Sequence, residues 1–215
     1  MFDVSSKTIV DKKFRLAELY RLMSADKDIK ANAKNILSIT LSNVLSNDTL
    51  NLSEQGKVKE IYIFDIVLSD KTIPTLFIAA LDKAINLHTI FILHNDDKSM
   101  LYGAYKEQTE RGVKVGKYYS TEWKVSTEKI LLPLNVVRID DIYTAIIDLL
   151  IPIEAKEDES TEEFVARYAE ITKLRAEIEK LERLVNSERQ SKKRFELNAR
   201  LKSLKVQLEE LLRNG

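Results

Sequence analysis

The sequence predicts an α+β fold, with a mixed sheet of four to five strands and flanking helices, followed by a C-terminal coiled-coil helical hairpin. Three features indicate this fold. A strand–helix–strand pattern occupies residues 60–94, all three prolines and most aromatic residues lie before residue 155, and heptad spacing dominates the last third. An acidic stretch marks the change in composition. We therefore expect an α+β domain over 1–154 and a helical coiled-coil tail over 160–214.

The first elements are expected to be two helices. Apolar residues over 14–23 recur at the three- and four-residue spacing of an amphipathic helix, and a second short helix is expected over 28–37. The stretch 36–45 has a partly alternating apolar pattern, which fits either the end of a helix or a strand.

The centre of the domain predicts a strand, a helix and a second strand. Residues 60–70 are rich in β-branched and aromatic side chains, as buried strands are. A helix is expected over 72–86, with Thr72 as its N-cap and Pro74 in its first turn. The next strand is expected over 88–95. Because a helix connects the two strands, they should run parallel through a right-handed crossover.

Two further strands and a helix are expected to complete the domain. A turn over 95–98 leads to a return strand over 99–107, and a later strand covers 114–123. Residues 140–150 then predict a closing helix.

The tail contains two apolar runs with the heptad steps that are typical of coiled coils. The first is Ile171, Leu174, Ile178, Leu181 and Val185, and the second is Leu197, Leu201, Leu204, Leu208 and Leu211. The runs are out of register, which leaves two arrangements open. The chain can reverse within 186–192 as a hairpin, which we favour because Asn-Ser suits a reversal, or it can continue as one helix that pairs with a second copy.

Bulk composition excludes several classes of protein. Lys and Arg total 34 and Asp and Glu total 34, so no overall positive field draws the chain to nucleic acid or an anionic membrane. Cysteine is absent, which removes disulfides and thiolate chemistry. No apolar run approaches the ~20 residues that span a bilayer, and the N-terminus is too charged for a signal peptide. We expect a cytoplasmic protein, without a cofactor because the glycines are too scattered for a phosphate loop.

Five residues of the α+β domain are candidate binding residues. Asp82 and Lys83 form either a polar site at the end of the sheet or a solvated helix face. Tyr105, Lys106 and Trp123 lie on the expected late strands. Aromatic side chains interleaved with lysine can stack on bases and hold phosphates, and the alternative is that they belong to the core.

The tail offers a second candidate surface, because residues 188–205 are locally basic. Arg189, Lys192, Lys193 and Arg194 form either a phosphate-contacting tip or the solvated face of a charged helix.

Catalytic and metal-binding constellations are poorly represented. His88 and His94 would lie about 20 Å apart on one strand, so they are expected as strand-end residues rather than as a shared metal site. A metal-dependent nuclease could use Glu60, Asp65 and Asp96, but the acid-x-Lys triplet that begins at Asp96 falls in a turn. We therefore assign no catalytic residue and no metal ligand.

Several segments carry a family resemblance. They are VKEIYIFDIVL, ALDKAIN, HTIFIL, AYKE, KYYSTEW and DDIY, with ERQSKKRFELNARLKSLKVQLEEL in the tail. In order and spacing they resemble an uncharacterised prokaryotic family, catalogued as a domain of unknown function, number four-three-nine-one. The resemblance extends from Thr8 to Leu211. The chain departs from the family at 85–86 and at 43–47, so no catalytic role is carried over there.

The resemblance implies a genomic setting beside helicases and DNA methyltransferases, in restriction-modification and antiviral (phage) defence loci. We therefore expect a non-enzymatic accessory subunit of a DNA-directed assembly. Its helical tail and α+β domain would bind a helicase, methyltransferase or nuclease subunit, or its coiled coil would form a homo-oligomer. The alternatives are a nucleic-acid-binding module and a metal-dependent nuclease.

Overall fold

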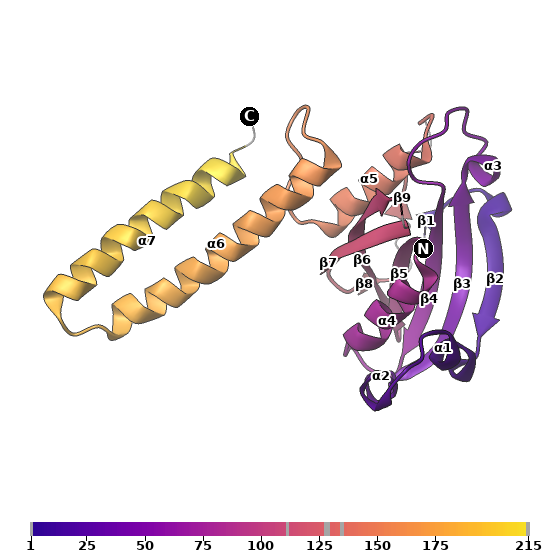
Figure 1. Ribbon diagram of the computed structural model, residues 1–215, viewed down its shortest axis with the longest axis horizontal. Coiled ribbons are helices and arrows are strands. Elements are labelled where there is room, and N and C mark those ends of the chain that lie inside the picture. Colours follow the sequence, from indigo (N-terminus) through magenta and orange to yellow (C-terminus); the bar gives the residue numbers. More distant parts are fainter. Residues whose placement is uncertain (1, 111, 127–129, 134–135, 214–215) are drawn as a thin grey trace. The chain divides into compact units, whose positions relative to one another are not determined.

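The computed structural model describes residues 2–110, 112–126, 130–133 and 136–213. The chain divides into two compact units, residues 1–150 and residues 151–215. A β-sheet with packed helices forms the first unit, and two long helices dominate the second (Figure 1).

Among the described residues, a path of six strands forms the main sheet in the order β2-β3-β4-β5-β6-β7. The strands are β2 (Ile9–Phe14), β3 (Ile36–Ser46), β4 (Glu60–Leu68), β5 (His88–Asn95), β6 (Lys98–Thr109) and β7 (Gly112–Ser120). Neighbours are antiparallel except β4 and β5. These two are parallel, as the sequence predicts, and α4 (Thr75–Ile85) connects them.

Three short strands complete the β-structure of the described residues. β8 (Lys124–Val125) pairs with β6. β1 (Phe2–Asp3) pairs with β9 (Ile130–Leu131) in a separate two-stranded sheet.

The main sheet therefore has more strands than the four to five expected from the sequence. β2 was not predicted because it is an edge strand, exposed at every position except the half-buried Phe14, and so lacks the alternation of a half-buried strand. Asp11 has a φ of 48°, and the pairing of β2 with β3 shifts register there, which is a bulge. Phe14 closes this strand, and the first helix, α1 (Leu16–Leu22), begins after it.

The ambiguous stretch after the second helix is a strand. Residues 36–46 form β3, which pairs with β4 along almost its whole length. The second helix, α2 (Lys27–Asn32), is therefore shorter than expected. A 3-10 turn at Ser6–Thr8 precedes β2. The single helical turn α3 (Asn47–Leu50) follows β3.

Helices cover both faces of the sheet. Phe77 of α4 lies in one apolar cluster with Phe64 and Phe91, to which α1 and α2 also contribute. α5 (Ile139–Leu150) packs on the opposite face, where a Cβ added at Gly103 of β6 would stand 3.2 Å from Leu150 Cδ1. Because side chains alternate along a strand, even-numbered residues of β6 face α4 and odd-numbered residues face α5.

The start of α4 differs from its prediction. Pro74 occupies the N-cap with ψ at 68°, so the helix begins at Thr75, and Thr72 does not cap it. Proline disfavours helical backbone in the residue before it, which keeps Ile73 outside the helix. The cap comes from elsewhere in the sequence, because Asn32 Oδ1 accepts a hydrogen bond from the Phe77 amide at 3.1 Å.

The second unit is built from α6 (Thr161–Ser187) and α7 (Ser191–Leu212), which run side by side in opposite directions (Figure 1). The chain reverses over 188–190, so Asn186 and Ser187 belong to α6 rather than to the turn. Glu177–Arg200 and Glu182–Lys205 ion pairs cross between the helices at 2.5 and 2.7 Å. Neither these helices nor any other in the described chain has the length and apolarity that crossing a membrane requires.

Candidate functional site

Four polar side chains form a hydrogen-bonded group on the α4 face of the sheet, which we call the Asp82 cluster. It consists of Asp82 from the last turn of α4, Thr89 from β5, Lys106 from β6 and Tyr118 from β7. Lys106 Nζ donates to Asp82 Oδ1 and to Thr89 Oγ1, and its third bond reaches the Leu87 carbonyl oxygen at 2.7 Å. Thr89 Oγ1 donates to Asp82 Oδ1, and Tyr118 Oη donates to Asp82 Oδ2 at 2.7 Å.

A β-bulge brings Tyr118 into this cluster. Ala104 lies opposite Tyr118, but Lys106 lies opposite Val115, so β7 has one residue more than β6 over this stretch. Regular pairing would place Lys117 opposite Ala104 and turn Tyr118 away from α4. The bulge uses Gly116, where an added Cβ would stand 2.9 Å from the Tyr105 carbonyl oxygen.

Burial and charge shift the pKa values around the cluster. Burial lowers the pKa of Lys106, and the Asp82 carboxylate opposes that shift. Burial and the nearby Asp82 charge raise the pKa of Tyr118 well above its usual range, so the phenol remains a hydrogen-bond donor. Burial and the Lys106 charge lower the pKa of His88 to about 4, where its ring packs edge-on against Tyr143 with 4.7 Å between centroids. His88 is therefore neutral at neutral pH.

The hydrogen bonds of the Asp82 cluster satisfy its own charges. Lys106 uses its ammonium on three acceptors, and both carboxylate oxygens of Asp82 accept bonds from within the chain. A general base or nucleophile needs a lone pair within reach of a substrate, whereas Asp82 and Lys106 are both fully buried. The arrangement therefore acts as a structural ion pair that ties α4 to β5 and β6.

A hollow of about 540 Å³ lies beside the cluster, between α4 and the edge strand β7. Its lining residues are Ala79, Lys83, Asn86, Val113, Val115, Gly116 and Tyr118. Asn86 Oδ1 accepts from the Val113 amide at 3.1 Å, which fixes the start of β7 to the C-terminal end of α4. With Asn86 and Tyr118 engaged in the fold, Lys83 supplies the exposed charge of this hollow.

The structure brings together only two of the five candidate residues in this unit. Asp82 and Lys106 form one buried ion pair, and Lys83 is exposed on the neighbouring hollow. Tyr105 points to the opposite face of the sheet, where its ring stacks on Tyr143 at 6.3 Å. Trp123 was expected on a strand, but it lies between β7 and β8 and packs half-buried against the apolar cluster. Tyr105, Lys106 and Trp123 therefore do not form one base-stacking surface.

The basic candidates lie at the turn of the second unit. Arg189 is in the connection between α6 and α7, and Lys192, Lys193 and Arg194 are in the first turn of α7. All four side chains are exposed, and Phe195 follows them with 76% of its surface exposed. The same short segment therefore presents an aromatic ring and four cations to solvent.

Sequence reasoning missed the Asp65–His94 pair. His94 was expected as an isolated strand-end residue, but its Nε2 lies 2.5 Å from Asp65 Oδ1. The signal was the parallel pairing of β4 with β5, which sets Asp65 opposite Ile92 and so beside the next residue on that face, His94. Thr89 and Tyr118 were also missed, since neither carries a pattern that separates a cluster member from an ordinary strand residue.

The residues of the nuclease alternative are not brought together. Tyr62 Oη donates to Glu60 Oε2 at 2.5 Å, which raises the pKa of Tyr62 to about 12. Glu60 and Asp65 are five residues apart on one strand, so they face opposite sides of the sheet at a separation of roughly 17 Å. Asp96 lies in the turn after β5. In the part of the chain that the structure describes, no three His, Asp or Glu side chains converge as a metal site requires.

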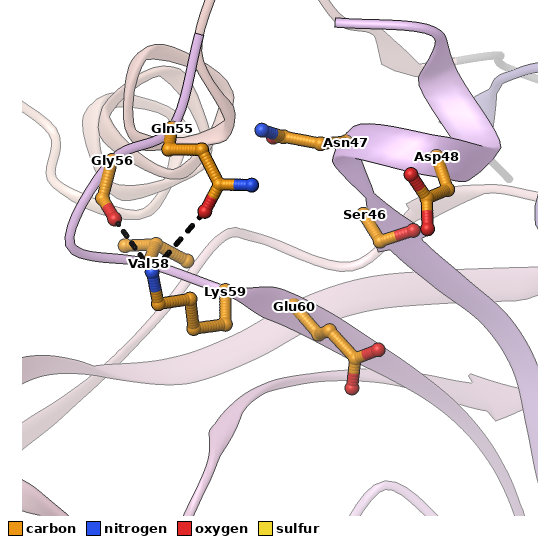
Figure 2. Close-up of a pocket in the computed structure, with 8 residues that line it drawn as sticks. All are labelled: Ser46, Asn47, Asp48, Gln55, Gly56, Val58, Lys59 and Glu60. Carbon is orange, nitrogen blue, oxygen red and sulfur yellow. Dashed lines mark hydrogen bonds between the residues drawn. The ribbon is translucent and has the colours of Figure 1, made fainter.

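Glu60 instead belongs to a second hollow, shown in Figure 2, at the start of β4. Its lining residues are Ser46, Asn47, Asp48, Gln55, Gly56, Val58, Lys59 and Glu60. Lys59 Nζ donates to Gln55 Oε1 and to the Gly56 carbonyl oxygen at 3.5 and 3.4 Å, as drawn in Figure 2. Lys59 therefore holds the loop that borders this hollow by hydrogen bonds.

The fold defines a mixed α/β protein with a C-terminal helical unit, and the buried Lys106–Asp82 pair links α4 to the sheet. The chain belongs to the family described as Domain of unknown function (DUF4391), since the model of that family matches residues 2–208. This match confirms the family resemblance of the sequence. Neither a curated protein nor a solved structure matches the chain.

Proposed function

We propose that this protein is a non-enzymatic accessory subunit, which binds partner proteins of a DNA-directed assembly through its helical hairpin and its sheet unit. One observation carries the proposal. None of the 22 residues of α7 is buried within the chain, although its leucine run is half-covered by α6. A helix that leaves so much of its surface uncovered has a face available for another protein.

The sheet unit supports the same proposal from its polar groups. The Asp82 cluster has the composition of an active site, with a buried lysine, a carboxylate and a tyrosine. These side chains, however, hydrogen-bond to one another. An accessory protein needs a stable scaffold of this kind and no reacting group.

The class of partner follows from the family resemblance, which implies helicase, methyltransferase or nuclease subunits of restriction or phage-defence systems. Coiled-coil packing of the two tail helices is part of the proposal. The apolar run of α6 from Ile171 to Leu181 is buried, and the opposed run of α7 from Leu197 to Leu211 is half-buried, as knobs-into-holes packing would leave them.

Co-expression tests the proposal directly. The full chain, tagged at one end, is produced with each protein encoded beside it, and complexes are resolved by size-exclusion chromatography with light scattering. We expect a complex of fixed stoichiometry with at least one of these proteins, and no complex with an unrelated helicase of the same host. Failure to bind any of the neighbouring proteins would contradict the proposal.

A nucleic-acid-binding module is the second candidate, and the exposed cations at 189–194 with Phe195 favour it. Its affinity would fall steeply with salt, because each phosphate contact releases counterions. Charge reversal at Lys192, Lys193 and Arg194 would then reduce DNA binding at least about tenfold, as measured by fluorescence anisotropy. An affinity that stays the same in this variant would exclude the tip as a nucleic-acid contact.

A further inference from the structure

The outer face of α7 carries a second heptad stripe, on the side away from the leucine run. Its members follow one another at steps of three and four residues, and all are exposed: Lys192, Phe195, Ala199, Lys202, Val206 and Glu209. Successive helical residues turn by about 100°, so Phe195 and Val206, eleven positions apart, point in nearly the same direction. Leu204 points to the other side, towards α6. We call the six residues the outer stripe.

The order of residues along the outer stripe is self-complementary. If a second α7 is laid antiparallel to the first, with a twofold axis midway between Arg200 and Leu201, Phe195 falls opposite Val206 of the other copy. The same register sets Lys192 opposite Glu209, and each contact occurs twice, as twofold symmetry requires.

The centre of the stripe fits this register as well. Ala199 falls opposite Lys202, and the small alanine leaves space for the methylene stem of the lysine, whose ammonium reaches solvent. One alignment therefore pairs the two apolar residues, pairs the opposite charges and sets the small alanine opposite the long lysine.

We propose that the outer stripe of α7 docks on the same stripe of a second copy of this chain, forming an antiparallel twofold dimer. Charge complementarity selects this occupant over a nucleic acid. Glu209 would repel phosphates, but it matches Lys192 of the second copy. Phe195 and Val206, both strongly exposed in the single chain, become covered together. This inference deepens the proposed function, because it rests on the same helical unit.

Sedimentation equilibrium of the full chain tests the dimer. We expect a dimer at micromolar concentration, weakened roughly 100-fold or more by Phe195→Asp, because one substitution removes two symmetric contacts. Since Phe195 is 76% exposed, the variant should keep the thermal unfolding temperature of the monomer. The proposal would be overturned by a wild-type chain that remains a monomer at a concentration about 100-fold above micromolar, or by a dimer that Phe195→Asp leaves intact.

A charge swap tests the register. Lys192→Glu alone and Glu209→Lys alone should each weaken the dimer about tenfold or more, and the double variant should restore it. Lys193→Glu is the matched control, since this residue is the neighbour of Lys192 but lies off the stripe, and we expect an unchanged dimer. If the double variant is no tighter than either single one, the antiparallel register is wrong.

The outcomes separate the two proposals. A monomeric chain that still binds a protein encoded beside it contradicts the dimer and supports the proposed function. A dimer that binds none of those proteins supports the stripe and contradicts the accessory role. If the chain is a monomer whose DNA binding is abolished by Phe195→Asp, the stripe is a nucleic-acid face and the dimer is overturned.

Discussion

Two ion pairs of this protein, one in each unit, differ strongly in their exposure to solvent. In the sheet unit, the Lys106–Asp82 pair has both side chains 0% exposed and is held by further hydrogen bonds. In the helical unit, the Arg183–Glu179 pair has side chains that are 76% and 64% exposed. The same chemical pairing therefore occurs at both limits of solvent access.

The comparison separates charges that maintain the fold from charges that remain available. Two charges withdrawn from water become dependent on each other, because either one alone would be buried without compensation. Charges in water lose little when their partner is removed, so they can exchange partners at low cost. The buried Lys106–Asp82 pair is thus suited to stabilising the fold, whereas the charges of the exposed Arg183–Glu179 pair remain accessible.

The largest effect on stability is expected from Lys106→Met, which tests this contrast. The substitution leaves the Asp82 carboxylate buried without its cation, so we expect the free energy of unfolding to fall by about 3–5 kcal/mol at neutral pH. Urea unfolding followed by the fluorescence of Trp123 measures this loss, since the single tryptophan packs against the core of the sheet unit.

The double variant Lys106→Met with Asp82→Leu is the control for this prediction. Removing both charges should recover part of the loss, because no buried charge is left uncompensated, although the Thr89 and Tyr118 hydroxyls lose their acceptor. A single variant that loses less than about 1 kcal/mol would show that the pair behaves as an exposed one, and the contrast between buried and exposed pairs would not hold.

A smaller effect is expected from the pH dependence of His88. Burial and the Lys106 charge lower its pKa from 6.5 to about 4 in the folded protein. Between pH 6.5 and 4 the unfolded chain binds the His88 proton more tightly than the folded chain. The contribution of His88 to stability is therefore complete above pH 6.5 and is lost as the pH falls towards 4. We expect a loss of about 2–3 kcal/mol between pH 7 and 4.5 from this group.

His88→Phe keeps a ring against Tyr143 and removes the titration. Urea unfolding of this variant should lack the part of the pH dependence that comes from His88. If wild type and variant lose stability in parallel over this range, folding does not lower the pKa of His88.

Tyr118→Phe should have the next largest effect. The variant keeps the ring, which stacks on Tyr102 at 5.2 Å, but removes the hydrogen bond to Asp82 Oδ2. Loss of a bond to a charged acceptor costs about 2 kcal/mol, less than loss of the cation itself. Urea unfolding compares the stability of this variant with that of the wild type. Equal stability of the two would place the Asp82 carboxylate in contact with water.

The sequence was sufficient where local pattern and burial agree. The buried strand 60–68, the helix that follows it and the strand from residue 88 were predicted because each has its own periodicity and end signals. β2 was missed because its partner, rather than its own pattern, makes it a strand. The apolar runs of the tail predicted its two helices, and the reversal was placed correctly within 186–192 although Asn-Ser does not form it.

The candidate site was harder, because its contacts join distant parts of the chain. Asp82 lies four residues after Ile78, on the buried side of α4, so a carboxylate at that position already indicated a buried partner. Lys106 likewise follows Tyr102 and Ala104 on one face of β6. The bulge at Gly116, which turns Tyr118 inward, depends on the pairing of two strands and leaves no signal in the residue pattern.

The smallest expected effect is that of Arg183→Ala in α6. The arginine pairs with Glu179 one turn earlier on the helix, in full contact with water. Such pairs stabilise a helix by about 0.3–0.5 kcal/mol, and alanine returns part of this through its helix propensity. We therefore expect the unfolding temperature, followed by the circular dichroism at 222 nm, to lie within about 1 °C of wild type.

Arg167→Ala is the informative control in the same helix, because Arg167 is buried and bonds to Glu159 and to the Leu211 carbonyl oxygen, at the end of α7. If Arg183→Ala proves as costly as Arg167→Ala, then burial does not decide the cost of losing an ion pair in this unit, and the division between structural and available charges fails.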